Sequence, residues 1–254
     1  MSTRITYLGH ATVHVESASG SLLTDPFLSQ RILWLRRHVP LPMDPRSLVQ
    51  PSAILISHAH YDHLDLPSFK YISSKVPIIL PKGLGRLVSK FVKNSLIEIK
   101  PGESHEISKI RVTAVPVTHR GFRLSGLTFR NCNGYLMEMD GKKIFFPGDT
   151  GYRPDFRTSV EDFQKSDGPL EAALLPIGPC RPEWFMRRNH LNPEDAIRVF
   201  RELGAKIMIP IHWGTLRLSH EPIHEPIQQL SRLISQYDLK EQVRILKHGE
   251  TTEL

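Results

Sequence analysis

Short apolar runs alternate with amphipathic stretches along the whole chain. The apolar runs that predict strands lie at 3–8, 11–16, 20–24, 53–57, 77–80, 95–99, 110–118, 133–139, 142–147, 171–176, 206–211 and 243–247. The stretches with helical periodicity are 192–204, 222–236, 66–75 and 83–93. Strands come before and between helices in both halves of the chain, which predicts a mixed α/β architecture.

The segment 192–204 carries clear helix-end signals. Asn192 can cap the start, Pro193 suits the first turn and Gly204 can close the end. The 20 prolines of the chain are scattered at the ends of elements, and no low-complexity linker interrupts it. We therefore predict a single domain over residues 1–254.

Composition narrows the class of protein. Hydrophobic residues make up 40% of the 254 residues and charged residues 23%, which excludes a disordered chain. No apolar run approaches the about 18 residues of a membrane-spanning helix, and the first residues alternate like a strand rather than forming a signal peptide. With only two cysteines, neither a disulfide framework nor a thiolate metal site is expected, and a cytoplasmic location is the default.

The net charge is +7, from 33 basic and 26 acidic residues. An excess of this size is compatible with anionic substrates, nucleic acid or an acidic membrane surface, and equally with a basic surface that has no specific partner. The 13 histidines are more informative, because several lie beside aspartates.

One such group stands in residues 53–65, AILISHAHYDHLD. An apolar strand ends there and is followed by His58, His60, Asp62 and His63. Imidazole nitrogens and carboxylate oxygens suit zinc and similar metals. His58 and His60 point the same way in an extended segment and can share one metal ion, whereas Asp62 and His63 can reach a second. Unrelated surface histidines are the alternative, which this density of ligands disfavours.

Three further ligand types each follow a buried strand. His119 comes after IRVTAVPVT, Asp149 after KKIFFPG and His212 after AKIMIPI. Each alone would more often be structural. Together they predict a set of loops at one sheet edge, where sites in such sheets commonly lie.

These residues carry a family resemblance. HAHYDH matches the HxHxDH signature of the metallo-β-lactamase superfamily, and its other four motifs appear in chain order at Asp25, His119, Asp149 and His212. More narrowly, the chain resembles the N-acyl-phosphatidylethanolamine-hydrolysing phospholipase D family. The matching segments are YLGHATVHVE, LLTDPFLS, ISHAHYDHLD, FPGDTGYRP, LPIGPCRPEWFMRRNHLNPEDA, IPIHWGT and LKHGET, which span almost the whole chain.

The resemblance implies an αββα sandwich of two mixed β-sheets with helices on the outer faces. It also implies two divalent metal ions, zinc first and iron or manganese as alternatives. The matching ligands are His58, His60 and His119 for one ion and Asp62, His63 and His212 for the other. Asp149 would bridge both ions, and Asp25 would hydrogen-bond into the HAHYDH loop and orient its ligands.

The implied reaction converts N-acyl-phosphatidylethanolamine-like lipids to N-acylethanolamine and phosphatidic acid by a metal-bridged hydroxide. Its catalytic residues would be Asp149, Asp62 and His190. His190, in RRNHLNPEDA, matches a family histidine near the metals and is the candidate proton donor to the leaving group. The alternative for His190 is a surface histidine at a helix start. Neighbouring arginines could contact a phosphate or serve only solubility, namely Arg181, Arg187 and Arg188.

Other functions remain as alternatives. A phosphodiesterase or nuclease of the same superfamily is one, although the interval between Asp149 and His212 is too short for a large nucleic-acid-binding insertion. No nucleic acid is therefore expected as a partner. A sugar-phosphate lactonase on a soluble substrate is another. A non-catalytic scaffold is disfavoured because no ligand position is lost.

The segment FLSQRILWLRRHVPLP combines apolar and basic residues. Its apolar members are Phe27, Leu28, Ile32, Leu33, Trp34 and Leu35, and its basic members are Arg31, Arg36 and Arg37. Such a composition predicts peripheral membrane contact through residues 27–37, on the inner membrane face. Packing on the protein's own core or on a homodimer partner is equally compatible. The loop HRGFRLSG, which begins at His119, departs from the animal members of the family, so the resemblance does not predict the acyl-chain preference.

Overall fold

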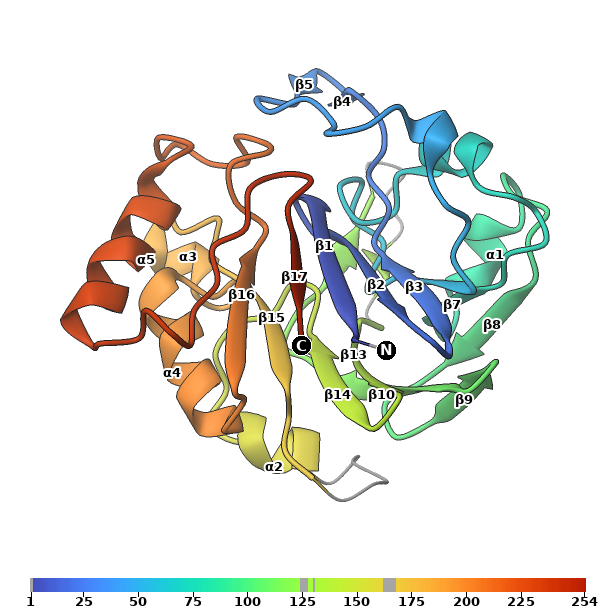
Figure 1. Cartoon of the computed structure of the whole chain (residues 1–254). Coiled ribbons are helices and arrows are strands. Elements are labelled where there is room, and N and C mark those ends of the chain that lie inside the picture. Colours follow the sequence, from blue (N-terminus) through green and yellow to red (C-terminus); the bar gives the residue numbers. More distant parts are fainter. Residues whose placement is uncertain (1, 124–127, 130, 162–167) are drawn as a thin grey trace.

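Two mixed β-sheets lie face to face, with helices on the outer side of each (Figure 1). The computed structural model describes residues 2–123, 128–129, 131–161 and 168–254. Part of the loop HRGFRLSG therefore lies outside the described residues. Among those that are described, one large sheet has the order β17-β1-β2-β3-β6-β7-β8 and the other β16-β15-β14-β13-β10-β9.

The strands are short and follow the apolar runs closely. The first sheet contains β1 (Arg4–Gly9), β2 (Thr12–Ser17), β3 (Gly20–Thr24), β6 (Ala53–Leu55), β7 (Ile78–Pro81), β8 (Leu96–Ile99) and β17 (Thr251–Glu253). The second contains β9 (Ser104–Ile107), β10 (Ile110–Pro116), β13 (Asn133–Met139), β14 (Lys142–Phe146), β15 (Ala172–Pro176) and β16 (Ile207–Ile211). Two small ribbons pair β4 (Arg31–Ile32) with β5 (Leu35–Arg36) and β11 (Gly121–Phe122) with β12 (Thr128–Phe129).

Each sheet changes from antiparallel to parallel pairing along its width. β1, β2 and β3 are antiparallel, whereas β3, β6, β7 and β8 are parallel. In the other sheet β9, β10, β13 and β14 are antiparallel, and β14, β15 and β16 are parallel. The parallel strands β7, β15 and β16 are buried along almost their whole length, as their continuous apolar runs require, whereas the edge strand β8 is partly exposed.

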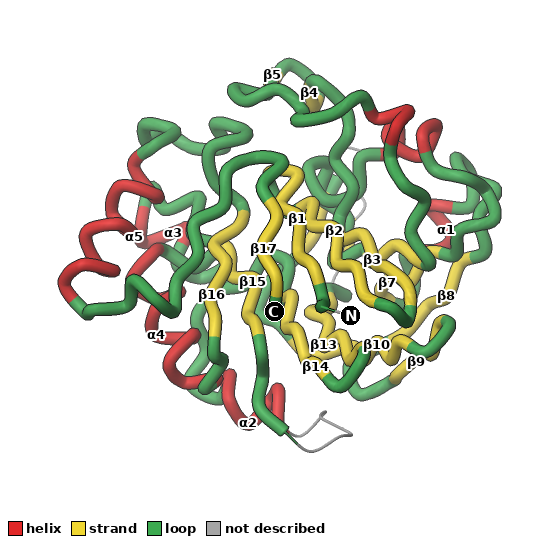
Figure 2. Tube along the Cα trace, in the orientation of Figure 1, coloured by secondary structure: helices red, strands yellow, loops and turns green. Residues whose placement is uncertain are grey.

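The helices complete the four layers. They are α1 (Gly85–Val88), α2 (Phe156–Glu161), α3 (Glu183–Met186), α4 (Pro193–Leu203) and α5 (Glu225–Gln236), with 3₁₀ turns η1 (Pro45–Ser47) and η2 (Leu66–Tyr71). α2, α4 and α5 cover the outer face of β14–β16, while the outer layer over β3–β8 is mostly loop with short helical turns (Figure 2). The αββα prediction is confirmed.

Alternating side chains divide the interior into separate cores. Tyr7 and Val13 of the first sheet pack between the sheets against residues such as Tyr135 and Phe146 of the second. The outer face of the second sheet packs under α4 through residues such as Val199. α4 begins at the Asn192 cap, whose side chain accepts from Asp195 N–H, and ends at Gly204 in the left-handed region with φ 61°. The predicted capping of this helix is confirmed.

Some predicted elements are wrong. The strand expected at 243–247 is reduced to one bridge between Val243 and Met208, and the chain turns away to form β17, which pairs Glu253 with Arg4. The helix expected over 83–93 extends only over Gly85–Val88, and that over 66–75 is the 3₁₀ turn η2. β9 escapes the apolar pattern because it is an exposed edge strand that alternates in burial. Within the described residues, every helix is too short or too polar to cross a membrane.

Candidate metal centre

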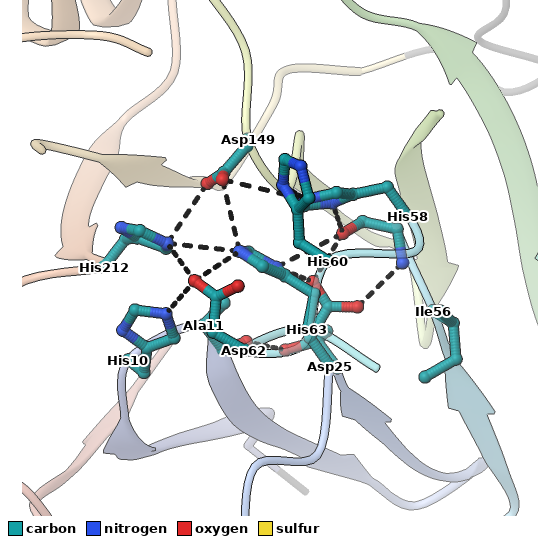
Figure 3. A network of polar contacts seen from close by, with 12 residues as sticks. His10, Ala11, Asp25, Ile56, His58, His60, Asp62, His63, Asp149 and His212 are labelled. Carbon is teal, nitrogen blue, oxygen red and sulfur yellow. Dashed lines mark hydrogen bonds and ion pairs between the residues drawn. The ribbon is translucent and has the colours of Figure 1, made fainter. Parts of the chain in front are cut away.

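The carboxyl ends of strands from both sheets meet at one edge of the molecule. β1 leads to His10, β3 to Asp25 and β6 to the HAHYDH segment. From the opposing sheet, β14 leads to Asp149 and β16 to His212. Figure 3 shows their side chains converging on a common centre. The predicted set of strand-end loops therefore does come together in space.

The first cluster, called site 1 here, contains His58, His60, His119 and Asp149. His58 Nε2 and His119 Nε2 lie 2.9 and 3.1 Å from His60 Nδ1. The Asp149 carboxylate oxygen Oδ2 is 3.8 Å from His58 Nε2 and 3.9 Å from His119 Nε2. Three imidazole nitrogens and a carboxylate oxygen thus face a single point.

The hydrogen bonds around site 1 orient the lone pairs of its imidazoles. His119 Nδ1 is 2.9 Å from the carbonyl oxygen of Asn189, which only accepts, so His119 carries its proton on Nδ1. Ser57 Oγ lies 2.5 Å from Asp25 and 2.9 Å from His58 Nδ1. If Ser57 donates to the carboxylate, it accepts from His58 Nδ1. Both Nε2 atoms then present lone pairs to the centre, as metal ligation requires.

The second cluster groups Asp62, His63 and His212 with His10. The first three match the expected ligands and are called site 2, with Asp149 on its other side. His63 Nε2 and His212 Nε2 are 3.1 Å apart, and Asp62 Oδ2 lies 3.6 and 3.4 Å from them. His63 Nδ1 is 2.6 Å from Asp25 Oδ2, so its Nε2 is turned toward the cluster. Asp25 thereby contacts the HAHYDH loop in the manner expected of it.

Asp149 lies between the two clusters. Its Oδ2 atom is 3.3 Å from His63 Nε2, and its Oδ1 atom is 3.3 Å from His212 Nε2 (Figure 3). The side chain is buried, and Oδ1 has no hydrogen-bond partner among the described residues. Burial raises the pKa of Asp149, but the imidazoles of His212, His63 and His190 outweigh it and hold the pKa well below its usual range. A buried anion with an unsatisfied oxygen fits a carboxylate that bridges two cations.

His190 lies beside Asp149, with its Nδ1 atom 3.5 Å from Asp149 Oδ2. Its ring centroid is 5.2 Å from that of His119. The residue is largely buried rather than a surface histidine at a helix start, and its Nδ1 has no hydrogen-bond partner within the described part of the chain. This is the position expected for a group that acts next to the metals without ligating them.

Sequence reasoning missed His10. It follows β1 in YLGHATVHVE and is 2% exposed, and its Nε2 atom lies 2.9 Å from Asp62 Oδ2. His10, Asp25 and His212 all have positive φ, at 59°, 31° and 61°. Left-handed backbone at non-glycine residues concentrates at functional sites. The available signal was the position of His10 directly after a strand, which it shares with His212.

A pocket of about 380 Å³ opens over the two clusters. Its floor is polar, with His60, Asp62, Asp149 and His190. Its walls are almost entirely apolar, with Ile32, Leu33, Trp34, Leu35, Pro179, Phe185, Met186 and Leu218 beside Tyr61. The hairpin β4–β5 and the helix α3 therefore both contribute apolar side chains to the entrance of the candidate metal centre.

The apolar segment 27–37 divides between the interior and the surface. Ile32 packs on Phe27 and Leu216, whereas Leu33 and Trp34 at the hairpin tip are 41% and 74% exposed. Arg37 is not a surface group, because it is buried and its guanidinium donates to the carbonyl oxygen of Phe27 at 2.8 Å. The expectation that Arg37 faces a membrane is wrong.

Two of the three arginines near His190 are engaged in ion pairs. Arg187 donates to both oxygens of Asp195, at 2.9 and 3.0 Å. Arg181 pairs with Glu225. These contacts favour a structural role for both over a contact with phosphate.

Comparisons with known proteins agree with this geometry. The model of the Beta-lactamase superfamily domain matches residues 21–213. The chain is 33% identical to N-acyl-phosphatidylethanolamine-hydrolyzing phospholipase D 1 of Caenorhabditis elegans, over 93% of this chain and 71% of that protein. It is 28% identical to a UPF0173 metal-dependent hydrolase of Deinococcus radiodurans, over 99% of each chain.

Several other matching relatives are longer, and the chain spans 55% to 62% of their length. The fold is similar to the crystal structure of a possible metal-dependent hydrolase from Veillonella parvula DSM 2008. That similarity has a TM-score of 0.81 at 18% identity and covers 100% of both chains.

Proposed function

The chain belongs to the metallo-β-lactamase superfamily and is a metal-dependent hydrolase, and we propose that it cleaves phosphodiester bonds in N-acyl-phosphatidylethanolamine-like lipids. The products would be N-acylethanolamine and phosphatidic acid. The observation that carries this proposal is the pocket, whose floor includes residues of both candidate metal clusters and whose walls are apolar. A lipid phosphodiester needs both features at once. The relative from Caenorhabditis elegans is named for this activity, which supports the same substrate class.

The donor set of the site fits two divalent ions. Sites 1 and 2 offer nitrogen and oxygen atoms and no sulfur, which suits zinc and also iron or manganese. Two neighbouring ions of this kind supply an activated water and positive charge for the attacking and leaving oxygens. Asp149 would hold both ions, and Asp62 would hold the second.

His190 is the residue that we assign to the leaving oxygen. Burial lowers its pKa to about 4, so in the free protein the imidazole is neutral at pH 7. A neutral imidazole still has one N–H to donate as a hydrogen bond. An anionic phosphodiester bound beside the ring would raise its pKa again and favour proton transfer to the alkoxide.

The hairpin tip is where we propose that the protein contacts a lipid surface. Leu33 and Trp34 are exposed on one side of the pocket, and Trp184 and Phe185 of α3 are 76% and 52% exposed close to its other wall. Arg36 lies next to the tip and is exposed. Apolar insertion and attraction of arginine to anionic lipid act together in peripheral binding. A substrate drawn from that surface would enter directly between the two walls.

A substrate panel tests the activity. Metal-loaded protein is offered N-acyl-phosphatidylethanolamine in mixed micelles, a soluble aryl phosphodiester, a DNA oligonucleotide and a sugar-phosphate lactone. We expect N-acylethanolamine and phosphatidic acid from the first substrate and slower cleavage of the second. Opening of the lactone alone, or cleavage of the oligonucleotide alone, would overturn the proposal in favour of a soluble substrate.

Vesicle co-sedimentation tests the lipid contact. The double variant Leu33→Ser, Trp34→Ser should lose binding to anionic vesicles, because both apolar groups at the tip are removed. Phe91→Ser is the matched control, since Phe91 is also an exposed aromatic but does not line the pocket. Arg36→Glu should flatten the salt dependence of binding. If the double variant binds like the parent, the contact fails, and a change in its oligomeric state would assign the tip to a homodimer instead.

A further inference from the structure

His10 occupies a place in the site that no ligand assignment covers. It follows β1 and is buried, and its Nε2 atom contacts Asp62, so that His10 is close enough to Asp62, His63 and His212 to belong to the same group of potential ligands. The Asp62 oxygen that it reaches is Oδ2, which also lies 3.4 Å from His212 Nε2 and 3.6 Å from His63 Nε2. His10 therefore contacts the oxygen that would ligate the ion in site 2 (Figure 3).

We propose that His10 is a positioning residue for site 2, which holds the Asp62 carboxylate through its imidazole and His212 through its main-chain carbonyl. This inference rests on the proposed two-ion site. It assigns a role that is separate from those of the seven ligands.

The polarity of the contact separates positioning from ligation. An ionised carboxylate only accepts hydrogen bonds, so His10 Nε2 must carry the proton in its 2.9 Å contact with Asp62. A protonated ring nitrogen has no lone pair for a metal. Carboxylates that ligate metals are commonly held by a hydrogen bond of this kind, which fixes the direction of their lone pairs.

The backbone of His10 makes the second connection. The N–H of His212 donates to the carbonyl oxygen of His10 at 2.8 Å, and the N–H of His10 donates to Thr215 Oγ1 at 2.8 Å. His10 and His212 both adopt left-handed backbone, which an ordinary residue keeps only where its surroundings enforce it. The hydrogen bond between the two turns therefore stabilises the backbone of each. It thereby also constrains the direction of the His212 side chain.

Packing around the preceding residue, Gly9, leaves no room for a side chain at that position of the turn. Gly9 has a φ of 112°, and a Cβ there would lie 2.2 Å from Cδ2 of His248. His248 Nε2 is in turn 2.8 Å from Thr215 Oγ1, the group that accepts from His10. Segments from the start and the end of the chain thus hold the His10 turn against the β16 loop.

These contacts link ligands that come from different sheets. Asp62 follows β6 in the first sheet, and His212 follows β16 in the second. His10 touches both, and none of its described hydrogen bonds reaches His58, His60 or His119. Loss of its imidazole should consequently weaken site 2 and spare site 1.

A metal titration tests this role. Chelator-treated parent, His10→Ala and His10→Asn are titrated with cobalt, and binding of each equivalent is followed by absorbance and calorimetry. Asparagine tolerates left-handed backbone and keeps an N–H donor. His10→Asn therefore separates loss of the imidazole from loss of the backbone conformation of the turn. His14→Ala is the matched control, because His14 is a buried histidine of the adjacent strand that contacts neither cluster.

The expected result is a first equivalent that binds as in the parent and a second that binds 10- to 100-fold more weakly in His10→Ala, with a smaller loss in His10→Asn. The control should bind both equivalents normally. Two equivalents at parental affinity in a folded His10 variant would overturn the role of His10 alone. Equal weakening of both equivalents would overturn it too, since His10 would then support the fold generally. A parent that binds one ion would overturn the two-ion site itself and His10's role with it.

Discussion

Sites 1 and 2 use similar side chains in different electrostatic surroundings. In site 1, burial lowers the pKa of His58 well below its usual range and that of His119 to about 4, and it also lowers the pKa of His60. In site 2, burial lowers the pKa of His63, but Asp149, Asp62 and Asp25 outweigh it and raise the pKa well above its usual range. The imidazoles of site 1 are therefore neutral beside the Asp149 carboxylate, while His63 of site 2 carries a proton that an ion must displace.

The two clusters also differ in how they are supported. In site 1, Ser57 contacts His58 from the adjacent position in the chain, and the carbonyl oxygen of the distant Asn189 accepts from His119. In site 2, Asp25 contacts His63, while His10 contacts Asp62 from the first sheet and the backbone of His212 from the second. The comparison predicts that an ion would bind more tightly in site 1 than in site 2, and that binding in site 2 would depend more strongly on pH.

The largest effect is expected from Asp149, the residue that both clusters share. Asp149→Asn removes the charge that would bridge the ions, so metal occupancy should fall in both clusters and phosphodiesterase activity should fall about 10³-fold or more. Elemental analysis and a soluble aryl phosphodiester measure the two quantities. Two retained ions with activity within tenfold of the parent would contradict the bridging role.

Substitution of His190 should lower turnover without changing metal binding. His190→Ala is expected to keep both ions and to lower turnover by about 10²-fold, since it removes only the group assigned to the leaving oxygen. The same two measurements apply. Loss of an ion would make His190 a ligand, and unchanged turnover would remove its assigned role.

The affinity for metal should depend on pH differently in site 1 and in site 2. Below the raised pKa of His63, binding in site 2 must expel one proton, so its affinity should increase about tenfold per pH unit as the pH rises through the neutral range toward that pKa. The site 1 histidines have lowered pKa values and are already neutral there, so its affinity should stay nearly constant until the pH falls toward about 4, the pKa of His119. Calorimetric titrations at several pH values measure this, and equal slopes for both equivalents would contradict the contrast.

Much of the fold could be predicted because local patterns determined it. Alternating or continuous apolar runs defined most strands, and the Asn192 and Gly204 signals fixed the ends of α4. The strand expected at 243–247 failed because an apolar run needs a partner, and only Val243 finds one. β17 has no apolar pattern. It forms because the backbone of β1 is available for antiparallel pairing on that side of the sheet. The single-domain prediction remains a prediction.

The candidate site likewise has residues that the sequence predicts and contacts that it does not. HAHYDH places its ligands by local spacing, and the lone ligands follow strand ends whose meeting is dictated by the sheets. The contact between His10 and Asp62 joins two segments far apart in the chain, so no spacing rule reveals it. Composition likewise could not show that Arg37 turns inward while Trp34 turns outward within one short segment.

The most direct measurement is a zinc titration of the metal-free protein that follows hydrolysis of a soluble aryl phosphodiester at pH 7. The first equivalent should fill site 1 and give little activity, and activity should appear with the second equivalent and reach its plateau at two per chain. A soluble substrate keeps lipid recognition out of the result. Full activity at one equivalent, or activity without metal, would contradict the account of two unequal clusters that act together.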